Sequence, residues 1–163
     1  MLRDGRMTVR DLVGLLVAIV VCFAAAGIGS LATVDAIPAW YAALHKPSWN
    51  PPNWIFGPVW SLLYLMMAVA VWLVWRTAGW SGAPLALGLF AFQLLLNVGW
   101  SVVFFGLHRP GWALVEIAVL WCAILATLLQ FWPIRPIAAL LLVPYLLWVT
   151  FASGLNFAIW RLN

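Results

Sequence analysis

Aromatic and amide side chains recur at helical spacing in the apolar segments of this chain. One segment carries Asn97 and Trp100, three residues apart, and another carries Trp148, Ala152 and Asn156 at intervals of four, so each set shares a helix face. Amides inside apolar segments are costly unless they are bonded, and an indole combines a large apolar face with one N–H donor. Such faces are typical of a mostly apolar small-molecule pocket with a few polar contacts.

A third face starts directly after a segment of unusual composition. Trp60 is the last of residues 40–60, WYAALHKPSWNPPNWIFGPVW, and Tyr64 follows one helical turn later. The four prolines of this segment exclude a continuous helix, because each lacks a backbone donor and restricts the residue before it. We therefore predict that residues 33–57, the first loop, form an ordered lid over the pocket. Its indole rings suit a boundary between apolar and wet surroundings.

Two interpretations of these faces remain open at this point. Any one of the side chains is explained as well by interhelical packing and hydrogen bonding as by a ligand. The set of Asn97, Trp60, Trp100 and Trp148 beneath an aromatic loop favours a pocket.

The chain offers little for other chemistry. Glu116 is an acidic residue inside an apolar segment, with no second carboxylate spaced for acid–base work, so we expect it to have a structural partner. His45 and His108 lie in separate loops, and no metal-ligand spacing, nucleophile elbow or phosphate loop is present. A hydrolase, an ATPase and an ion pump are therefore unsupported.

The composition identifies lipid as the solvent of this chain. Of its 163 residues 67% are hydrophobic and 7% are charged, whereas soluble domains carry about 25% charged residues. The net charge of +4 is small and scattered, which argues against nucleic-acid binding. Cys22 and Cys122 lie inside apolar runs and are interpreted as small core residues.

The pattern predicts an all-α membrane protein, a five-transmembrane-helix bundle that forms a single membrane domain over residues 1–163. The predicted spans are residues 9–32, 58–76, 85–107, 111–132 and 137–160. The first apolar run is about 20 residues, longer than the core of a signal peptide, so we expect it to be retained as a span. Pro144 is expected to kink the last span.

Five spans place the two termini on opposite sides of the membrane. The first loop, the turn at residues 108–110 and the C-terminus share one side. That side carries three cations, namely Lys46, Arg109 and Arg161. The side of the N-terminus carries five, namely Arg3, Arg6, Arg10, Arg76 and Arg135. The excess predicts a cytoplasmic N-terminus.

Three segments together resemble a known family. They are residues 40–60, LNVGWSVVFFGLHRP and PYLLWVTFASGLNFAIWRLN, and they are similar to the tryptophan-rich sensory protein and translocator protein family, also called the peripheral-type benzodiazepine receptor family. The resemblance implies a five-helix bundle, usually a homodimer, that binds protoporphyrin IX, haem, isoquinoline carboxamides and benzodiazepines without covalent attachment. By position, the implied ligand-binding residues are Tyr41, Pro51, Trp60, Asn97, Trp100, Trp148 and Ala152.

The resemblance also implies where this chain departs from the family. Some members bind cholesterol through a terminal motif centred on tyrosine, and here Phe157 stands in that region, so cholesterol is not expected as the physiological ligand. Some bacterial members are associated with light-dependent breakdown of protoporphyrin IX, and the two tryptophans implicated correspond to Trp60 and Trp148.

Three functions follow as hypotheses. The first is a porphyrin-binding sensor or transporter, with the porphyrin carboxylates meeting Lys46, Arg109 or His45 near the loop. The second is a light-dependent porphyrin-degrading enzyme that uses Trp60 and Trp148. The third is an interaction protein that dimerises through a face of small residues, namely Ala118, Cys122 and Ala126. The sequence does not rank transport against sensing.

Overall fold

A computed structural model describes residues 7–163. Its five long helices are α1 (Val9–Leu31), α2 (Asn53–Gly82), α3 (Pro84–Ser101), α4 (Pro110–Phe131) and α5 (Pro136–Leu162), with π-helical turns η1 (Ile37–Tyr41) and η2 (Val102–Gly106). Counting η2 with α3, all five are long and apolar enough to cross a membrane. The predicted all-α, five-helix fold is confirmed, and the described residues contain no strand. Arg3 and Arg6 lie outside the described residues.

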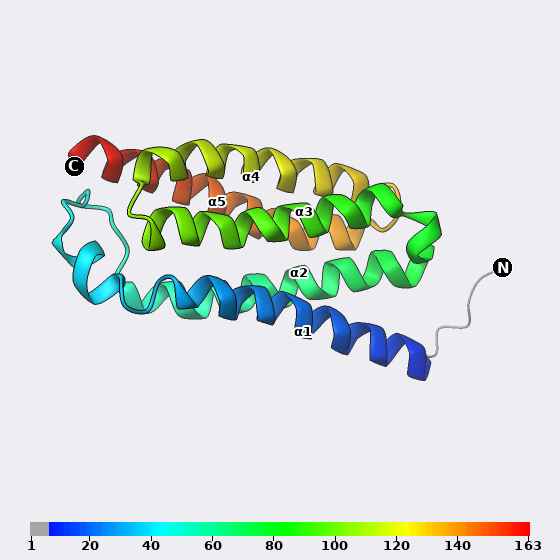
Figure 1. Cartoon of the computed structure of the whole chain (residues 1–163). Helices are drawn as coiled ribbons and strands as arrows, with labels where there is room; N and C mark the ends of the chain where they lie inside the picture. The colour runs from blue at the N-terminus through cyan, green and yellow to red at the C-terminus, as the bar shows by residue number, and fades with distance from the viewer. Residues whose placement is uncertain (1–6) are drawn as a thin grey trace.

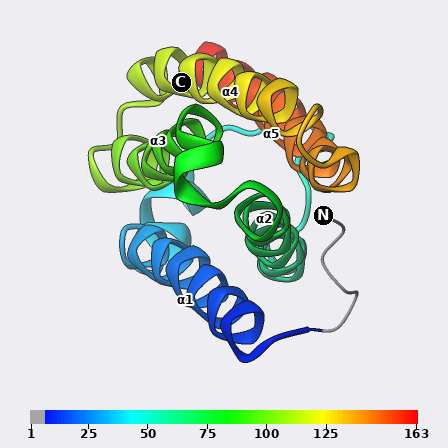
Figure 2. The same ribbon diagram turned by 90° about the vertical axis from the view of Figure 1, so that its right-hand side faces the viewer.

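The helices lie side by side in one bundle (Figure 1). The first loop, the link from α3 to α4 and the C-terminus share one end, as the five-span topology predicts, and α1 begins at the other end. Seen along the bundle, α1 is at its edge beside α2, with α4 and α5 on the far side (Figure 2). Many of the largest apolar side chains of α1 are exposed, which suits a helix whose outer face meets lipid.

Local sequence explains where the helices begin and end. α3, α4 and α5 each begin at a proline, namely Pro84, Pro110 and Pro136, because proline lacks only an N–H that would be unpaired in the first turn. α2 is interrupted near its end at Gly79, which has φ 68°, a conformation that glycine adopts at no steric cost.

The boundary of α2 differs from the sequence expectation. The helix begins at Asn53 rather than at Pro58, so Trp54 belongs to a helix and the first loop spans residues 32–52. Pro58 lies in the second turn of this helix and removes a single backbone hydrogen bond there. α5 is one continuous helix through Pro144, and the kink there stays a prediction.

The two cysteines have different environments. Cys22 is fully buried, as expected, whereas Cys122 is exposed on α4. The interpretation of Cys122 as a core residue was wrong, because composition alone does not tell which face of an apolar helix meets lipid. Ala118 is exposed one turn before it.

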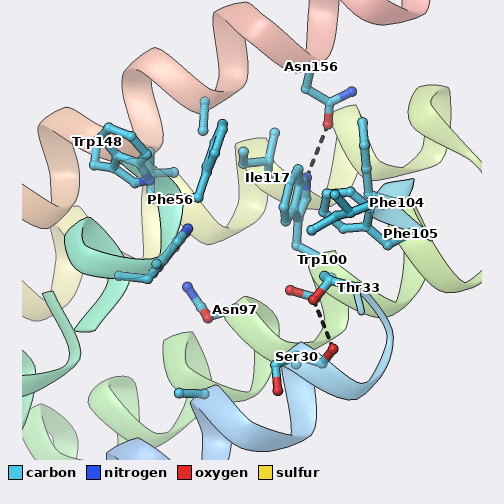
Figure 3. A pocket seen from close by; sticks show the side chains of 18 of the residues that line it. Ser30, Thr33, Phe56, Asn97, Trp100, Phe104, Phe105, Ile117, Trp148 and Asn156 are labelled. Carbon is cyan, nitrogen blue, oxygen red and sulfur yellow. Dashed lines mark hydrogen bonds between the residues drawn. The ribbon is translucent and has the colours of Figure 1, made fainter. Parts of the chain in front are cut away.

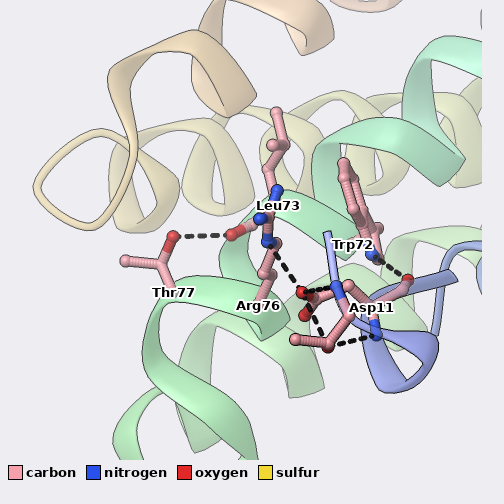
Figure 4. A network of polar contacts seen from close by, with 6 residues as sticks. Asp11, Trp72, Leu73, Arg76 and Thr77 are labelled. Atoms are coloured by element: carbon pink, nitrogen blue, oxygen red, sulfur yellow. Dashed lines mark hydrogen bonds and ion pairs between the residues drawn. The ribbon is translucent and has the colours of Figure 1, made fainter. Parts of the chain in front are cut away.

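Polar contacts fasten α1 to α2 at the end opposite the first loop (Figure 4). Asp11 is 3% exposed. Its carboxylate accepts bonds from the backbone N–H and the hydroxyl of Thr8, at 3.0 and 2.9 Å, and lies 3.5 Å from Nε of Arg76. The indole of Trp72 donates to the backbone carbonyl of Asp11 at 2.8 Å. We call these four residues the anchor; the sequence analysis did not find it.

Candidate ligand pocket

A cavity of about 390 Å³ lies in the half of the bundle beneath the first loop, within the size range of small-molecule sites. Figure 3 shows several of its walls, with Trp100 and Asn97 from α3, Trp148 from α5 and Phe56 from α2. Six of the seven predicted ligand-binding residues line it, namely Tyr41, Trp60, Asn97, Trp100, Trp148 and Ala152. Pro51 is not among the lining residues.

Two residues of the cavity lining, Tyr64 and Asn97, form a hydrogen-bonded row with the fully buried Tyr145, so that three helices are joined. The hydroxyl of Tyr64 on α2 donates to Oδ1 of Asn97 on α3. Nδ2 of Asn97 donates to the hydroxyl of Tyr145 on α5 at 2.9 Å. All three residues are buried. Because buried polar groups in lipid must find partners inside the protein, this row ties the helices together beside the cavity.

Trp100 is held as a wall by bonds at its edge and rings at its face. Its indole N–H donates to Oδ1 of Asn156 at 3.1 Å, and Nδ2 of Asn156 donates to the carbonyl of Pro110 at 2.8 Å. The ring stacks on Phe104, with centroids 5.0 Å apart and planes 22° from parallel. A fixed indole face is suited to stacking on a flat ligand.

The opposite wall consists of Trp60 and Trp148 with their neighbours. Phe56 meets Trp148 edge to face at 5.9 Å, and Trp60 packs against Tyr64 at 5.6 Å. Among the described residues no hydrogen bond involves the indole N–H of Trp60 or of Trp148, so both donors are available to a ligand.

The first loop is ordered by its own polar contacts. Nζ of Lys46 donates to the carbonyls of Tyr41, Ala42 and Leu44 at 2.7, 3.2 and 2.9 Å. The hydroxyl of Tyr41 donates to Asn50 at 2.8 Å. Burial raises the pKa of Tyr41 above its usual range, against a smaller lowering by the Asn50 bond, so this phenol stays neutral at physiological pH.

The loop is also seated on the ends of η2 and α5. Trp40 stacks on His108 at 4.4 Å and meets Phe104 edge to face at 5.5 Å. The side chain of Asn163 accepts from the backbone N–H of His45 at 3.0 Å and donates to its carbonyl at 2.9 Å. This reciprocal pair fastens the loop to the C-terminal end of α5.

None of the described residues that line the cavity is charged. The basic side chains that the sequence analysis expected near the porphyrin carboxylates are not lining residues. All three donors of Lys46 are used on backbone carbonyls, and Arg109 lines a separate surface cavity with Trp112. His45 is not a lining residue either. The described residues contain no cluster of three or more side chains that could hold a metal ion.

Comparison with known proteins places the chain in a family. A model of the TspO/MBR family matches residues 18–161, which include the second half of α1, nearly all of the other four helices and every residue that lines the cavity. The chain belongs to the TspO/MBR family. The resemblance found in the sequence is thereby confirmed, and membership supports a membrane protein of sensor or transporter type.

Several relatives of this TspO/MBR chain cover most of its length. It is 46% identical over 156 residues to the tryptophan-rich protein TspO of Chlorobaculum tepidum, covering 94% of this chain and 98% of that protein. It is 45% identical over 126 residues to the translocator protein of Homo sapiens, with 76% and 75% covered. The tryptophan-rich sensory protein of Cereibacter sphaeroides is 42% identical over 142 residues, with 87% and 86% covered.

Helical periodicity found most of the pocket of this TspO/MBR protein but not all of it. Phe56 was missed, although it lies one turn before Trp60, and so was Tyr145, which bonds to Asn97 but does not line the cavity. The sequence also predicted a structural partner for Glu116. Both its carboxylate oxygens are buried, and no described residue bonds to them, so the structural partner expected for it is not found.

Proposed function

We propose that this protein binds a tetrapyrrole, such as protoporphyrin IX or haem, non-covalently in the cavity beneath the first loop, and acts as a membrane sensor or transporter. The observation that carries the proposal is that six of the seven residues implied by the family resemblance line one cavity with tryptophan walls. A porphyrin is a flat apolar disc, and indole faces such as that of Trp100 are suited to stack on it.

The uncharged lining bears on how a porphyrin would lie. A carboxylate placed in an apolar cavity without a cation is strongly disfavoured. The cavity has exposed lining residues on α1 and α2, among them Ser30, Asn53, Gly57 and Ser61. In the proposed complex the disc occupies the cavity and its carboxylates lie outside this rim. Neutral isoquinoline carboxamides and benzodiazepines fit the same lining without that constraint.

Porphyrin titration of tryptophan fluorescence tests the proposal. Trp60→Phe and Trp148→Phe should each weaken binding of protoporphyrin IX roughly three- to tenfold, because each removes stacking area and one N–H donor. Trp80→Phe is the matched control, since Trp80 is 72% exposed at the other end of the bundle. Equal affinity in wild type and in both pocket variants would rule out this site.

A second candidate is the light-dependent degradation of protoporphyrin IX. It is favoured by the presence of Trp60 and Trp148, the two indoles it requires, in the lining of the same cavity. The protein with bound porphyrin should form a new absorbing product on illumination, and the double variant Trp60→Phe, Trp148→Phe should not. Equal porphyrin loss with the double variant, or with free tryptophan, would leave binding as the function.

We also propose a homodimer that pairs through α4 and an N-terminus in the cytoplasm. Ala118 and Cys122 give α4 an exposed face of small residues. Since Cys22 is buried, a thiol cross-linker in native membranes should link two copies through Cys122, and Cys122→Ser should abolish the product. Absence of a linked dimer in the wild type would count against this interface. Reporter fusions at each terminus would decide the orientation.

A further inference from the structure

The amide of Asn97 is hydrogen-bonded on two sides to tyrosines of other helices. Tyr64 donates to its oxygen, and its nitrogen donates to Tyr145 at 2.9 Å. The exposed fractions are 6% for Tyr64, 4% for Asn97 and 0% for Tyr145, so water competes little for these bonds. Figure 3 shows the Asn97 side chain pointing from α3 toward the space between Trp100, Phe56 and Trp148.

These bonds do not use all the hydrogen-bond donors of the Asn97 amide. A primary amide has two N–H donors. One N–H of Asn97 is used on Tyr145, and the second has no partner among the described residues. The indole N–H groups of Trp60 and Trp148 add two more open donors to the same lining.

The amide oxygens of the two buried asparagines of the lining, by contrast, each already accept one bond. Oδ1 of Asn97 accepts from Tyr64, and Oδ1 of Asn156 accepts from Trp100. The hydroxyls of Ser30 and Ser61 lie at the exposed rim and donate to carbonyls of their own helices. Each of these oxygens keeps a second lone pair, but the groups left without any bond are N–H donors, so a ligand that pairs them must supply acceptors.

We propose that Tyr64 and Tyr145 are positioning residues, which fix the Asn97 amide with its free N–H toward the cavity. This orientation makes the pocket selective for ligands that place an uncharged oxygen acceptor, such as a carbonyl, beside Asn97. The selectivity rests on the proposed function; the fixed orientation of the amide does not. An uncharged acceptor is required because no cation lines the cavity to compensate a buried carboxylate. If either tyrosine loses its hydroxyl, the amide gains freedom to rotate and the N–H is no longer presented in one direction.

If the row of Tyr64, Asn97 and Tyr145 had only a structural role, removing a tyrosine hydroxyl would change the free energy of unfolding and nothing else. The positioning role predicts a change in ligand preference, which stability does not report. Two readouts separate the roles, one without ligand and one with a matched pair of ligands.

The ligand-free readout is NMR of side-chain amides in lipid nanodiscs. The chain has five asparagines, so labelling with ¹⁵N-asparagine gives few signals, and Asn97→Ala identifies the Asn97 pair. We expect two distinct N–H signals, one shifted by the bond to Tyr145. Tyr145→Phe and Tyr64→Phe should each move this pair. Tyr41→Phe, whose hydroxyl bonds Asn50, is the control for these signals and should leave them in place.

The second readout compares an isoquinoline carboxamide with the thioamide of the same shape, whose sulfur is a weaker acceptor. Wild type should prefer the oxygen compound by roughly three- to tenfold, the contribution of one hydrogen bond. Tyr64→Phe and Tyr145→Phe should each bring this ratio close to one. The affinity ratio is measured on protein whose folding is verified by thermal unfolding. One folded tyrosine variant is enough for the test, because the two tyrosines bond opposite sides of the amide.

An oxygen preference that stays at the wild-type value in a folded tyrosine variant would overturn the proposal, as would an unmoved Asn97 signal. If wild type binds neither compound nor protoporphyrin IX, the proposed function and the selectivity fail, while the NMR readout still decides whether the tyrosines hold the amide. If porphyrin binds but the ratio never departs from one, the function stands and the selectivity is wrong.

Discussion

At the end of the bundle where α1 begins, charged and backbone groups join α1 to α2, whereas at the loop end the same two helices border a cavity. The anchor buries Asp11 against Arg76 and Trp72. Next to it Gly14 lies so close to Trp75 that an added Cβ would sit 2.2 Å from the ring. At the loop end, Gly57 and Gly27 have open space where a Cβ would stand.

This difference shows how an apolar bundle divides support from binding. In lipid, apolar helix faces gain little by leaving lipid for one another, so close packing and polar contacts decide which helices associate. The anchor supplies both for α1 at one end. The loop end is then free to keep an unfilled cavity, which costs packing energy, and aromatic contacts and three amide–tyrosine bonds hold its walls.

The largest expected effect is on the anchor. Asp11→Ala removes the carboxylate half of the capping box with Thr8 and the ion pair with Arg76, and we expect a loss of about 3 kcal/mol in the free energy of unfolding. Unfolding by denaturing detergent, monitored by circular dichroism, measures it. Asp35→Ala, at an exposed acidic residue of the first loop, is the control and should change stability little.

Affinity should behave differently from stability in this variant. Folded Asp11→Ala should bind protoporphyrin IX within about twofold of wild type. A large loss of affinity in folded protein would mean that the two ends of the bundle are not separable.

A smaller effect is expected from overpacking beside the anchor. Gly14→Ala places a methyl against the ring of Trp75 and should destabilise the protein by about 2 kcal/mol. Gly27→Ala, on the same helix with nothing within 4 Å, should be neutral or slightly stabilising. Similar melting temperatures for the two variants would refute the close approach of α1 to Trp75.

The smallest effect is expected where the first loop bonds to the C-terminal end of α5. Asn163→Ala removes the two bonds to His45 and should speed ligand dissociation by about fivefold with little change in stability, since one to two exposed bonds are lost. Stopped-flow dilution of bound porphyrin measures the rate. Arg161→Ala, an exposed neighbour on α5, serves as the control. An unchanged rate would show that the loop does not retain ligand.

Periodicity predicted the parts of the fold and site that depend on one helix at a time. Asn97 and Trp100, and likewise Trp148 and Ala152, line one cavity because residues three or four apart share a helix face. The helix positions were predictable from a different signal, since each apolar run is long enough to span a membrane.

The failures involve partners that only the folded chain brings together. Lys46 resembled a free cation near a ligand, but its ammonium bonds carbonyls that the loop turns toward it. Asp11 lies 61 residues from Trp72, and no local pattern indicates that they meet. Cys122 was misplaced because on an all-apolar helix the lipid face and the core face look alike in sequence.

In the proposed complex the loop-side cavity alone holds the porphyrin. Protoporphyrin IX is achiral, so it gives circular dichroism in its visible and near-ultraviolet bands only when the protein holds it in one orientation. We predict such a signal with wild type and with folded Asp11→Ala, and its loss with the double variant Trp60→Phe, Trp148→Phe. A signal of wild-type size from the double variant would contradict the account.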